Sequence, residues 1–430
     1  MVFTLKFIFF LAVLTNIGSC TNDKIFEPNT SNLPSIMDGS ADPIKKLTSP
    51  NTNVTINNLP KIENLVVNEN GQQLSFNIID DNESVGITLY GKKPGDTDYV
   101  NISELFTGDI GTHIAVGANK TITSIELNEY NEMALRVTDL EDFKLDILKT
   151  VSENRIQHDI QQLSGIRHYA LPQLLNQTRR YIKKEFEKYQ LDAALIHSFS
   201  WNSISAANVV GHHKGNINDN GTYIICAHFD SVRNTPGADD NASGTAGILE
   251  AMRILSQYEF KNSIAFIGFD LEEQGLIGSK EYVNELNTNH DILGVINFEM
   301  IGYPCRSAIC QDLPLSDTSI YNIALPEFTA LRTKFDAIGN EYVPKLKITS
   351  VEADNDPNFR RSDHAPFWSA NISALFITDG ANFRNPHYHQ TSDTPETLDY
   401  NFTKNIVATT VLTVMDLAGI NRTTSVHITL

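Results

Sequence analysis

From about residue 149 onward, short and continuously apolar runs alternate with helical patterns, and this alternation constrains the fold most. The runs are NVVG, TYIICA, SIAFIGFD, ILGVINFEM and ISALFIT. Such runs are typical of strands buried on both faces of a sheet. Stretches such as TAGILEAMRILSQY instead have apolar residues at helical spacing. The pattern predicts an α/β domain over residues 148–430, with a mixed, mostly parallel sheet flanked by helices.

The first twenty residues have the features of an export signal. Lys6 precedes the apolar run FIFFLAVL, which is too short to be a membrane span. The sequence IGSC, ending at Cys20, resembles the lipobox of bacterial lipoproteins, in which the cysteine is lipidated. The alternative is a plain signal peptide with an incidental cysteine. We therefore expect export, as a periplasmic or cell-envelope lipoprotein anchored to the membrane through Cys20, or as a secreted protein.

Two further segments lie between the signal and the α/β domain. Residues 21–59 are rich in Asn, Ser, Thr and Pro without a sustained apolar period, which predicts a flexible tether. Residues 60–147 contain short alternating segments such as LSFNII, GITLYG and MALRVT, separated by Gly, Asn and Asp. This pattern predicts a small β-sandwich accessory domain. It has no catalytic constellation, so positioning or partner contact is its expected role.

Composition and cysteines narrow the class of protein. A chain of 430 residues with 41% hydrophobic residues can bury large cores in more than one domain. Its 33 basic and 52 acidic residues give a net charge of −19, which argues against a nucleic-acid binder. Cys226 lies in an apolar run and is expected to be buried. Cys305 and Cys310 are close enough for a loop disulfide in an exported protein, with free thiols or a thiolate metal site as alternatives.

Side chains that can bind metal follow the apolar runs. In an open α/β sheet the carboxyl ends of the strands converge on one crevice, so residues far apart in sequence are expected to meet there. One further candidate lies in PGADDNASG, a loop that opens a helix. The candidates in chain order are His228, Asp230, Asp240, Glu272, Glu273, Glu299 and His389.

Imidazole and carboxylate without thiolate suit a catalytic zinc site. Two such ions usually share a bridging carboxylate, and acidic ligands offset their charge. Glu272 is next to a ligand but cannot easily reach the same ion, so it is free to act as a general base. Spacing alone does not separate Asp239 from Asp240. Glu272 and Glu273 have a second interpretation, which is charge attraction to a helix N-terminus.

Six motifs in a fixed order resemble the co-catalytic zinc aminopeptidase family, which includes bacterial leucyl aminopeptidases and, more distantly, glutamate carboxypeptidase. They are AHFDS, PGADDNASG, DLEEQG, NFEMIG, RSDHAPF and YHQTSDTPETLD, and the resemblance covers about residues 150–420. It implies two zinc ions bridged by Asp240. One ion would be completed by Glu273 and His389, and the other by His228 and Glu299.

The same resemblance implies the remaining roles. Glu272 would take a proton from the metal-bound water, which leaves a hydroxide between the two zinc ions as the nucleophile, and would pass that proton to the leaving amine. Asp230 would orient His228. Tyr388 would donate a hydrogen bond to the tetrahedral oxyanion, although it could also simply pack. Many members have aspartate where this chain has Glu299, and glutamate keeps the ligand type but adds a methylene.

The expected activity is that of an aminopeptidase, which removes single residues from the N-termini of peptides. A carboxypeptidase would need an arginine clamp, for which Arg360, Arg361 and Arg384 are candidates. A glutaminyl cyclase works with one metal ion, so a complete set of five ligands argues against it. A non-catalytic receptor with this fold would lose ligands, whereas here every ligand position has a competent side chain. Ser362-Asp363-His364 lacks a strand–GxSxG–helix elbow, so we reject a serine hydrolase. We expect this triplet to support the pocket floor or to contact substrate.

Overall fold

The computed structural model of the protein describes residues 60–67, 73–79, 84–94, 100–103, 106–108, 110–124, 132–139, 144–189, 191–215, 221–286, 291–420 and 423–429. The expected signal peptide, the lipobox cysteine Cys20 and the tether over residues 21–59 lie outside these described residues. Within the described residues, no helix combines the length and the apolar character that a membrane span requires.

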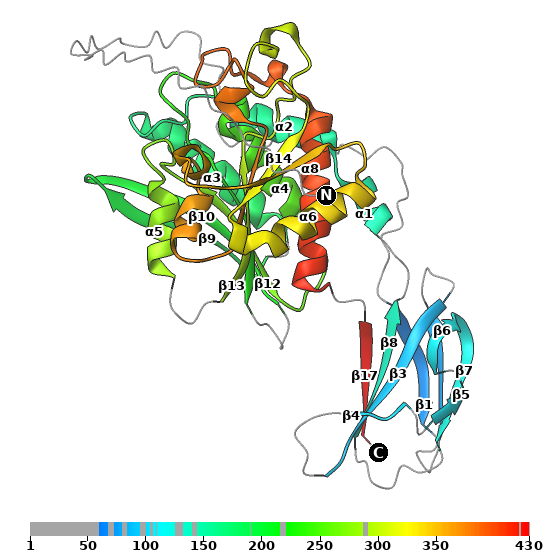
Figure 1. Ribbon diagram of the computed structural model, residues 1–430. Helices are drawn as coiled ribbons and strands as arrows, with labels where there is room; N and C mark the ends of the chain where they lie inside the picture. Colours follow the sequence, from blue (N-terminus) through cyan, green and yellow to red (C-terminus); the bar gives the residue numbers. More distant parts are fainter. Residues whose placement is uncertain are drawn as a thin grey trace, which may run out of the picture. The chain divides into compact units, whose positions relative to one another are not determined.

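An eight-stranded sheet forms the centre of the α/β domain, in the order β15-β14-β16-β13-β11-β12-β10-β9 (Figure 1). Four of its seven pairings are parallel, and β9–β10, β10–β12 and β14–β16 are antiparallel. The prediction of a mixed, mostly parallel sheet is confirmed. The strands are β9 Ala193–Trp201, β10 Ile204–His213, β11 Thr222–His228, β12 Ser263–Phe269, β13 Ile292–Glu299, β14 Ile320–Ala324, β15 Ile348–Glu352 and β16 Ala374–Thr378.

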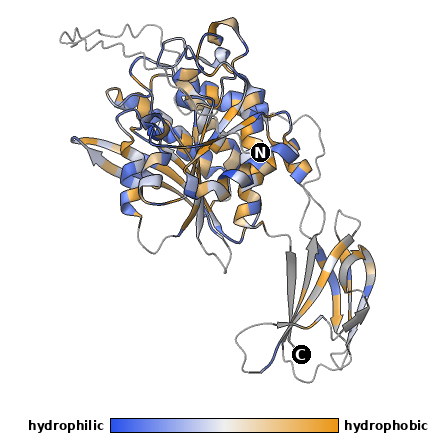
Figure 2. Ribbon diagram, in the orientation of Figure 1, coloured by the Kyte–Doolittle hydropathy of each residue, from blue (hydrophilic) through white to orange (hydrophobic). Residues whose placement is uncertain are grey.

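Helices cover both faces of this sheet, which explains why its central strands are continuously apolar. In β11, Ile225 and Ala227 join the core beneath α2, α3, α4, α6 and α8, whereas Ile224 and Cys226 join the core beneath α5 and α7. In Figure 2 the surrounding helices carry both apolar and polar residues. The helices are α1 Lys144–Thr150, α2 Glu153–Leu163, α3 Pro172–Glu187, α4 Gly244–Leu255, α5 Ile277–Glu285, α6 Thr329–Tyr342, α7 His364–Ser369 and α8 Tyr400–Ala418.

The chain reverses its direction across the sheet next to β11. It leaves β11 through α4 to reach β12 on one side, then returns through α5 to β13 on the other side. The two crossover helices pack on opposite faces, as right-handed connections in opposite directions require. A crevice forms outside the carboxyl ends of the strands at such a switch point. We therefore expect ligands to bind between the carboxyl ends of β11 and β13.

The small domain consists of two antiparallel sheets. One has the order β1-β2-β7-β5 and the other β17-β8-β3-β4, with β6 paired to β3. Alternating residues of β2 and β3, such as Leu74, Phe76, Val85 and Ile87, form a separate apolar core. The strands are β1 Lys61–Val67, β2 Gln73–Ile79, β3 Ser84–Lys92, β4 Val100–Asn101, β5 Phe106–Gly108, β6 Gly111–Ala115, β7 Gly117–Ser124, β8 Glu132–Asp139 and β17 Thr423–Thr429.

The end of the chain departs from the expected domain boundary. We assigned residues 148–430 to the α/β domain, but β17 pairs antiparallel with β8, from Thr423 opposite Thr138 to Thr429 opposite Glu132 (Figure 1). The last strand is thus a strand of the small domain, whose edge it extends by backbone hydrogen bonds.

The cysteines behave as their surroundings predict. Cys305 and Cys310 form a disulfide within the loop that follows β13. Cys226 is a buried free thiol in β11.

Candidate metal centre

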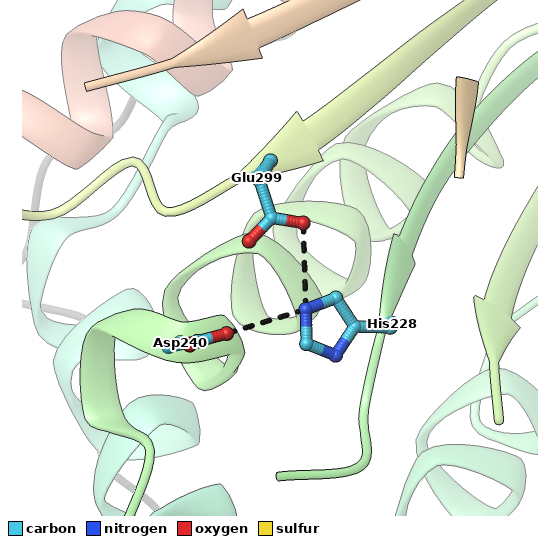
Figure 3. A group of neighbouring side chains, drawn as sticks. All are labelled: His228, Asp240 and Glu299. Carbon is cyan, nitrogen blue, oxygen red and sulfur yellow. Dashed lines mark ion pairs between the residues drawn. The ribbon is translucent and has the colours of Figure 1, made fainter. Parts of the chain in front are cut away.

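Two neighbouring parallel strands bring the first candidates together. His228 is the last residue of β11, Glu299 is the last residue of β13, and Asp240 lies in the loop before α4. His228 Nε2 is 3.3 Å from Asp240 Oδ1 and 3.4 Å from Glu299 Oε2 (Figure 3). All three side chains are buried, and together they could hold a metal ion.

The second oxygen of Asp240 faces a different histidine. His389 Nε2 lies 3.1 Å from Asp240 Oδ2 and 3.4 Å from Glu273 Oε2. These three residues form a second group that could hold a metal ion. The side chain of His389 is 33% exposed, so the cluster is open to solvent on this side. The Asp240 carboxylate thus joins the two groups, with one oxygen directed to each.

The residues fit zinc by two independent criteria. His228 Nε2 and Glu273 Oε1 are buried and have no hydrogen-bond partner among the described residues, which is costly unless a ligand satisfies them. Ligand atoms about 2.0–2.1 Å from a tetrahedral zinc ion are separated from one another by about 3.3–3.4 Å. Three of the four nitrogen–oxygen distances in the two groups, 3.3–3.4 Å, match that separation, and the fourth, 3.1 Å, is slightly shorter.

The structure also separates Asp240 from its neighbour Asp239. The Asp239 carboxylate accepts hydrogen bonds from the Gly302 backbone N–H at 2.9 Å and from Asn385 Nδ2 at 2.6 Å, so both of its oxygens are engaged elsewhere. Asp393 holds the turn, because its carboxylate accepts the backbone N–H groups of Asp239 and Asp240. Asp240 alone of the two faces the histidines.

Arg167 holds the loop before α4 through hydrogen bonds to its backbone, and the sequence did not indicate this residue. Its buried guanidinium donates hydrogen bonds of 2.6–2.8 Å to the carbonyl oxygens of Phe229, Pro236 and Gly237. Burial lowers the pKa of Arg167 to about 10, so the side chain remains cationic at neutral pH. Gly237 has φ +61°, and an added Cβ would lie 2.3 Å from the Asp240 carbonyl oxygen. Every residue has a backbone carbonyl, so the sequence contains no pattern of residue types that could have indicated these contacts of Arg167.

Asp230 connects the two glutamates that follow β12 with His228 at the end of β11. Its carboxylate accepts the backbone N–H groups of Glu272 at 3.0 Å and Glu273 at 3.2 Å, and it lies 3.4 Å from His228 Nδ1. It therefore fixes both glutamates after β12 as well as the histidine after β11. Glu272 Oε2 lies 3.9 Å from His228 Nε2, and a third possible metal-binding group consists of His228, Glu272 and Glu273.

Burial dominates the electrostatics of the acidic cluster. It raises the pKa of Glu272 well above its usual range, and the neighbouring Glu299 and Glu273 raise it further. Burial and Asp240 likewise raise the pKa of Glu273 to about 7. Burial alone would lower the pKa of His389, but Asp240 and Glu273 outweigh it and raise the value to about 10. Carboxylates crowded in this way favour a bound cation, which offsets both desolvation and mutual repulsion.

The RSDHAPF segment supports the cluster instead of supplying a nucleophile. Ser362 Oγ donates to Glu299 Oε2 at 2.6 Å and accepts from Asn297 Nδ2 at 2.8 Å. His364 Nε2 donates to the Phe359 carbonyl oxygen, so Ser362 is not paired with it. The rejection of a serine hydrolase is consistent with this arrangement.

Tyr388 packs directly on a candidate ligand. Its ring stacks on His389, with centroids 3.7 Å apart and an interplanar angle of 18°. The Tyr388 hydroxyl oxygen accepts a hydrogen bond from Arg361 Nη2 at 3.0 Å.

Residues 208–414 match the sequence profile of Peptidase family M28. The uncharacterized protein YfbL of Escherichia coli (strain K12) is 33% identical over 197 residues, which cover 41% of this chain and 61% of that protein. Leucine aminopeptidase 2 of Trichophyton rubrum is 36% identical over 177 residues, which cover 40% and 34% of the two chains. Aminopeptidase YwaD of Bacillus subtilis (strain 168) is 32% identical over 198 residues, with coverage of 45% and 40%. The chain thus spans less than two thirds of each of these relatives.

Solved structures support the fold. The Legionella pneumophila LapA aminopeptidase matches with a TM-score of 0.55 at 22% identity, covering 65% of this chain and 77% of that chain. The Macrostomum lignano glutaminyl cyclase matches with a TM-score of 0.54 at 14% identity, covering 66% and 95%. The region matched by the family profile contains all five candidate ligands. The match agrees with the zinc aminopeptidase family that the six motifs indicated, since residues 208–414 of the α/β domain are similar to Peptidase family M28.

Proposed function

We propose that this chain is a two-zinc aminopeptidase that hydrolyses the N-terminal bond of peptides. One observation carries the proposal, namely that the two oxygens of Asp240 face two different histidines at 3.3 and 3.1 Å. A carboxylate placed in this way can bridge two ions. The alternative group of His228 with both glutamates has no such bridging carboxylate, so we assign Glu272 a different role.

Asp240 would bridge the ions, His228 and Glu299 would complete one site, and Glu273 and His389 would complete the other. Zinc ions at these sites would polarise the scissile carbonyl and make water a stronger nucleophile. The remaining steps belong to side chains of the chain itself.

Glu272 is the proton carrier in this proposal. Burial raises its pKa well above the usual range, which suits a carboxylate that must accept a proton near neutral pH. It takes the proton of the attacking water and passes it to the leaving amine. Asp230 holds Glu272 in place through the backbone N–H, and Tyr388 donates its hydroxyl proton toward the developing oxyanion.

The three candidate arginine clamps of a carboxypeptidase differ in their availability. Arg384 is buried and donates to the Leu315 and Ser319 carbonyl oxygens, and Arg360 lies over the Trp368 ring, 5.6 Å from its centroid. Only Arg361 is near the cluster, where it contacts Tyr388. The acidic surroundings favour a substrate with a free α-ammonium group. Two complete ligand groups also favour this activity over the one-metal chemistry of a glutaminyl cyclase.

A pair of blocked substrates tests the proposal. The purified chain should release p-nitroaniline from leucyl-p-nitroanilide and cleave leucyl peptides amidated at the carboxyl end, but not N-acetylated ones. A chelator should abolish activity and zinc should restore it. Undiminished activity after complete metal removal, or preference for the N-acetylated substrate, would contradict the proposal.

We further propose that the protein is exported and anchored to the membrane of the cell envelope through Cys20, with peptides as substrates. This part depends on the IGSC sequence alone. Cys20→Ser should move the protein from the membrane fraction to the soluble fraction. Failure of the wild-type protein to incorporate a labelled lipid would refute the anchor.

A further inference from the structure

Arg361 is held in a defined orientation beside the cluster although it is exposed. Its Nη1 donates to Asn382 Oδ1 at 3.0 Å and to Asn358 Oδ1 at 3.4 Å, and its Nη2 donates to the Tyr388 hydroxyl oxygen at 3.0 Å. Acceptors on both sides fix a planar guanidinium better than a single contact would. The bond to Tyr388 is thus part of a small network built from three segments of the chain.

This bond determines what the Tyr388 hydroxyl can do. The phenol oxygen accepts from Arg361, and no described residue accepts a hydrogen bond from the Tyr388 O–H. The ring is fixed by its stacking on His389, so the hydroxyl lies at the edge of the candidate metal centre. The phenolic proton is therefore available to an incoming oxygen atom.

The charges around Tyr388 make the guanidinium important. The phenol oxygen is in direct contact with the Arg361 guanidinium, which is a cation. A phenol whose oxygen accepts from a cation is a stronger hydrogen-bond donor, because the cation polarises the O–H group. Such a donor gains most where negative charge develops, as on the carbonyl oxygen during attack.

We propose that Arg361 is a positioning residue that orients the Tyr388 hydroxyl toward the carbonyl oxygen of the bound peptide and strengthens the hydrogen bond donated there. The inference rests on the proposed peptidase function. It assigns Arg361 to the transition state and not to the carboxylate of the substrate.

A double-mutant cycle of Arg361→Met and Tyr388→Phe tests this coupling. Loss of one oxyanion donor usually lowers kcat by about 100-fold or more, so Tyr388→Phe should have that effect with little change in KM. Arg361→Met should lower kcat by about tenfold, the worth of one charge-assisted hydrogen bond. In the Tyr388→Phe background, Arg361→Met should cause no further loss. Arg360→Met is the matched control, because Arg360 contacts Trp368 and not Tyr388, and it should leave kcat unchanged.

A binding measurement gives a second readout. A phosphonate analogue of a leucyl dipeptide, which mimics the tetrahedral oxyanion, should bind Arg361→Met about tenfold more weakly by calorimetry, while KM changes little. Unfolding temperature and zinc content should match the wild type, since Arg361 is exposed.

Three results would overturn the inference. The first is an equal loss from Arg361→Met in the presence and absence of the Tyr388 hydroxyl. The second is an unchanged kcat. The third is a rise in KM confined to peptides with a free carboxyl end, which would make Arg361 a carboxylate clamp. An inactive wild-type enzyme would instead contradict the proposed function, so the two failures are distinguishable.

Discussion

The Ser362 hydroxyl lies between a buried amide and a proposed zinc ligand. Its removal should weaken zinc binding at one site while keeping every ligand. Ser362 Oγ donates to Glu299 Oε2 at 2.6 Å and accepts from Asn297 Nδ2, and Ser362 is fully buried. Glu299 has no other hydrogen-bond donor among the described residues. Ser362→Ala should therefore free the Glu299 carboxylate to rotate without changing any ligand.

The expected magnitude follows from the kind of bond that is lost. A hydrogen bond to a charged acceptor contributes about 1.5–3 kcal/mol. Each 1.4 kcal/mol corresponds to about a tenfold change in affinity. Zinc should thus bind the His228–Glu299 site about 10–100-fold more weakly, the usual effect of removing a partner that orients a ligand. The site of Glu273 and His389 should change little, because Ser362 touches neither residue.

Stepwise competition with a fluorescent zinc chelator measures the two affinities separately. Ser369→Ala is the matched control, since among the described residues Ser369 Oγ donates to the Ala365 carbonyl oxygen within α7 and to no other acceptor. That variant should bind both ions as the wild type does. Two unchanged affinities for Ser362→Ala, or an equal loss at both sites, would refute the reasoning.

Three other predictions follow from the buried acids. Glu272→Gln should keep both zinc ions but lower kcat at least about 100-fold; metal analysis and kinetics check this, and normal turnover contradicts the role. Zinc binding near neutral pH should release at least about one proton, because His389 has a pKa of about 10 until a cation displaces its proton. Calorimetry in buffers of different ionisation enthalpy measures the number of protons released, and a value of zero would contradict the prediction. Burial raises the pKa of Asp159 in the folded state to about 6, so stability falls as the pH rises from about 4 through 6. Asp159→Asn should therefore be more stable than wild type above about pH 6, by up to about 3 kcal/mol, with no difference below about pH 4. The variant keeps the local hydrogen bond, because Tyr181 can still donate to the amide oxygen. Equal denaturant midpoints of the two proteins at high pH would contradict this prediction.

Much of the site was predictable because it depends on strand ends. His228 and Glu299 terminate buried apolar runs, and parallel pairing of β11 with β13 brings such ends together without further information. The same rule placed Glu273 shortly after β12 and His389 after β16. Local apolar patterns were enough to predict the fold class and this convergence.

The rest depends on contacts that leave no local pattern. Arg167 binds carbonyl oxygens that every residue has, and Ser362 meets Glu299 across 63 positions of sequence. The β17 segment TTSVHIT has a strand-like pattern, but nothing in it indicates that its partner is β8, far upstream in the chain. Spacing alone did not separate Asp240 from Asp239, and only the motif favoured Asp240; the hydrogen bonds that Gly302 and Asn385 make to Asp239 give the physical reason why Asp239 faces elsewhere.

A crystal structure of the zinc-loaded protein, with anomalous data at the zinc edge, would show whether Asp240 bridges two ions. Two anomalous peaks should appear about 3.5–4 Å apart, with one oxygen of Asp240 bound to each. His228 and Glu299 should bind one ion, and Glu273 and His389 the other. A single peak, or two peaks that do not share Asp240, would rule out the proposed two-zinc site.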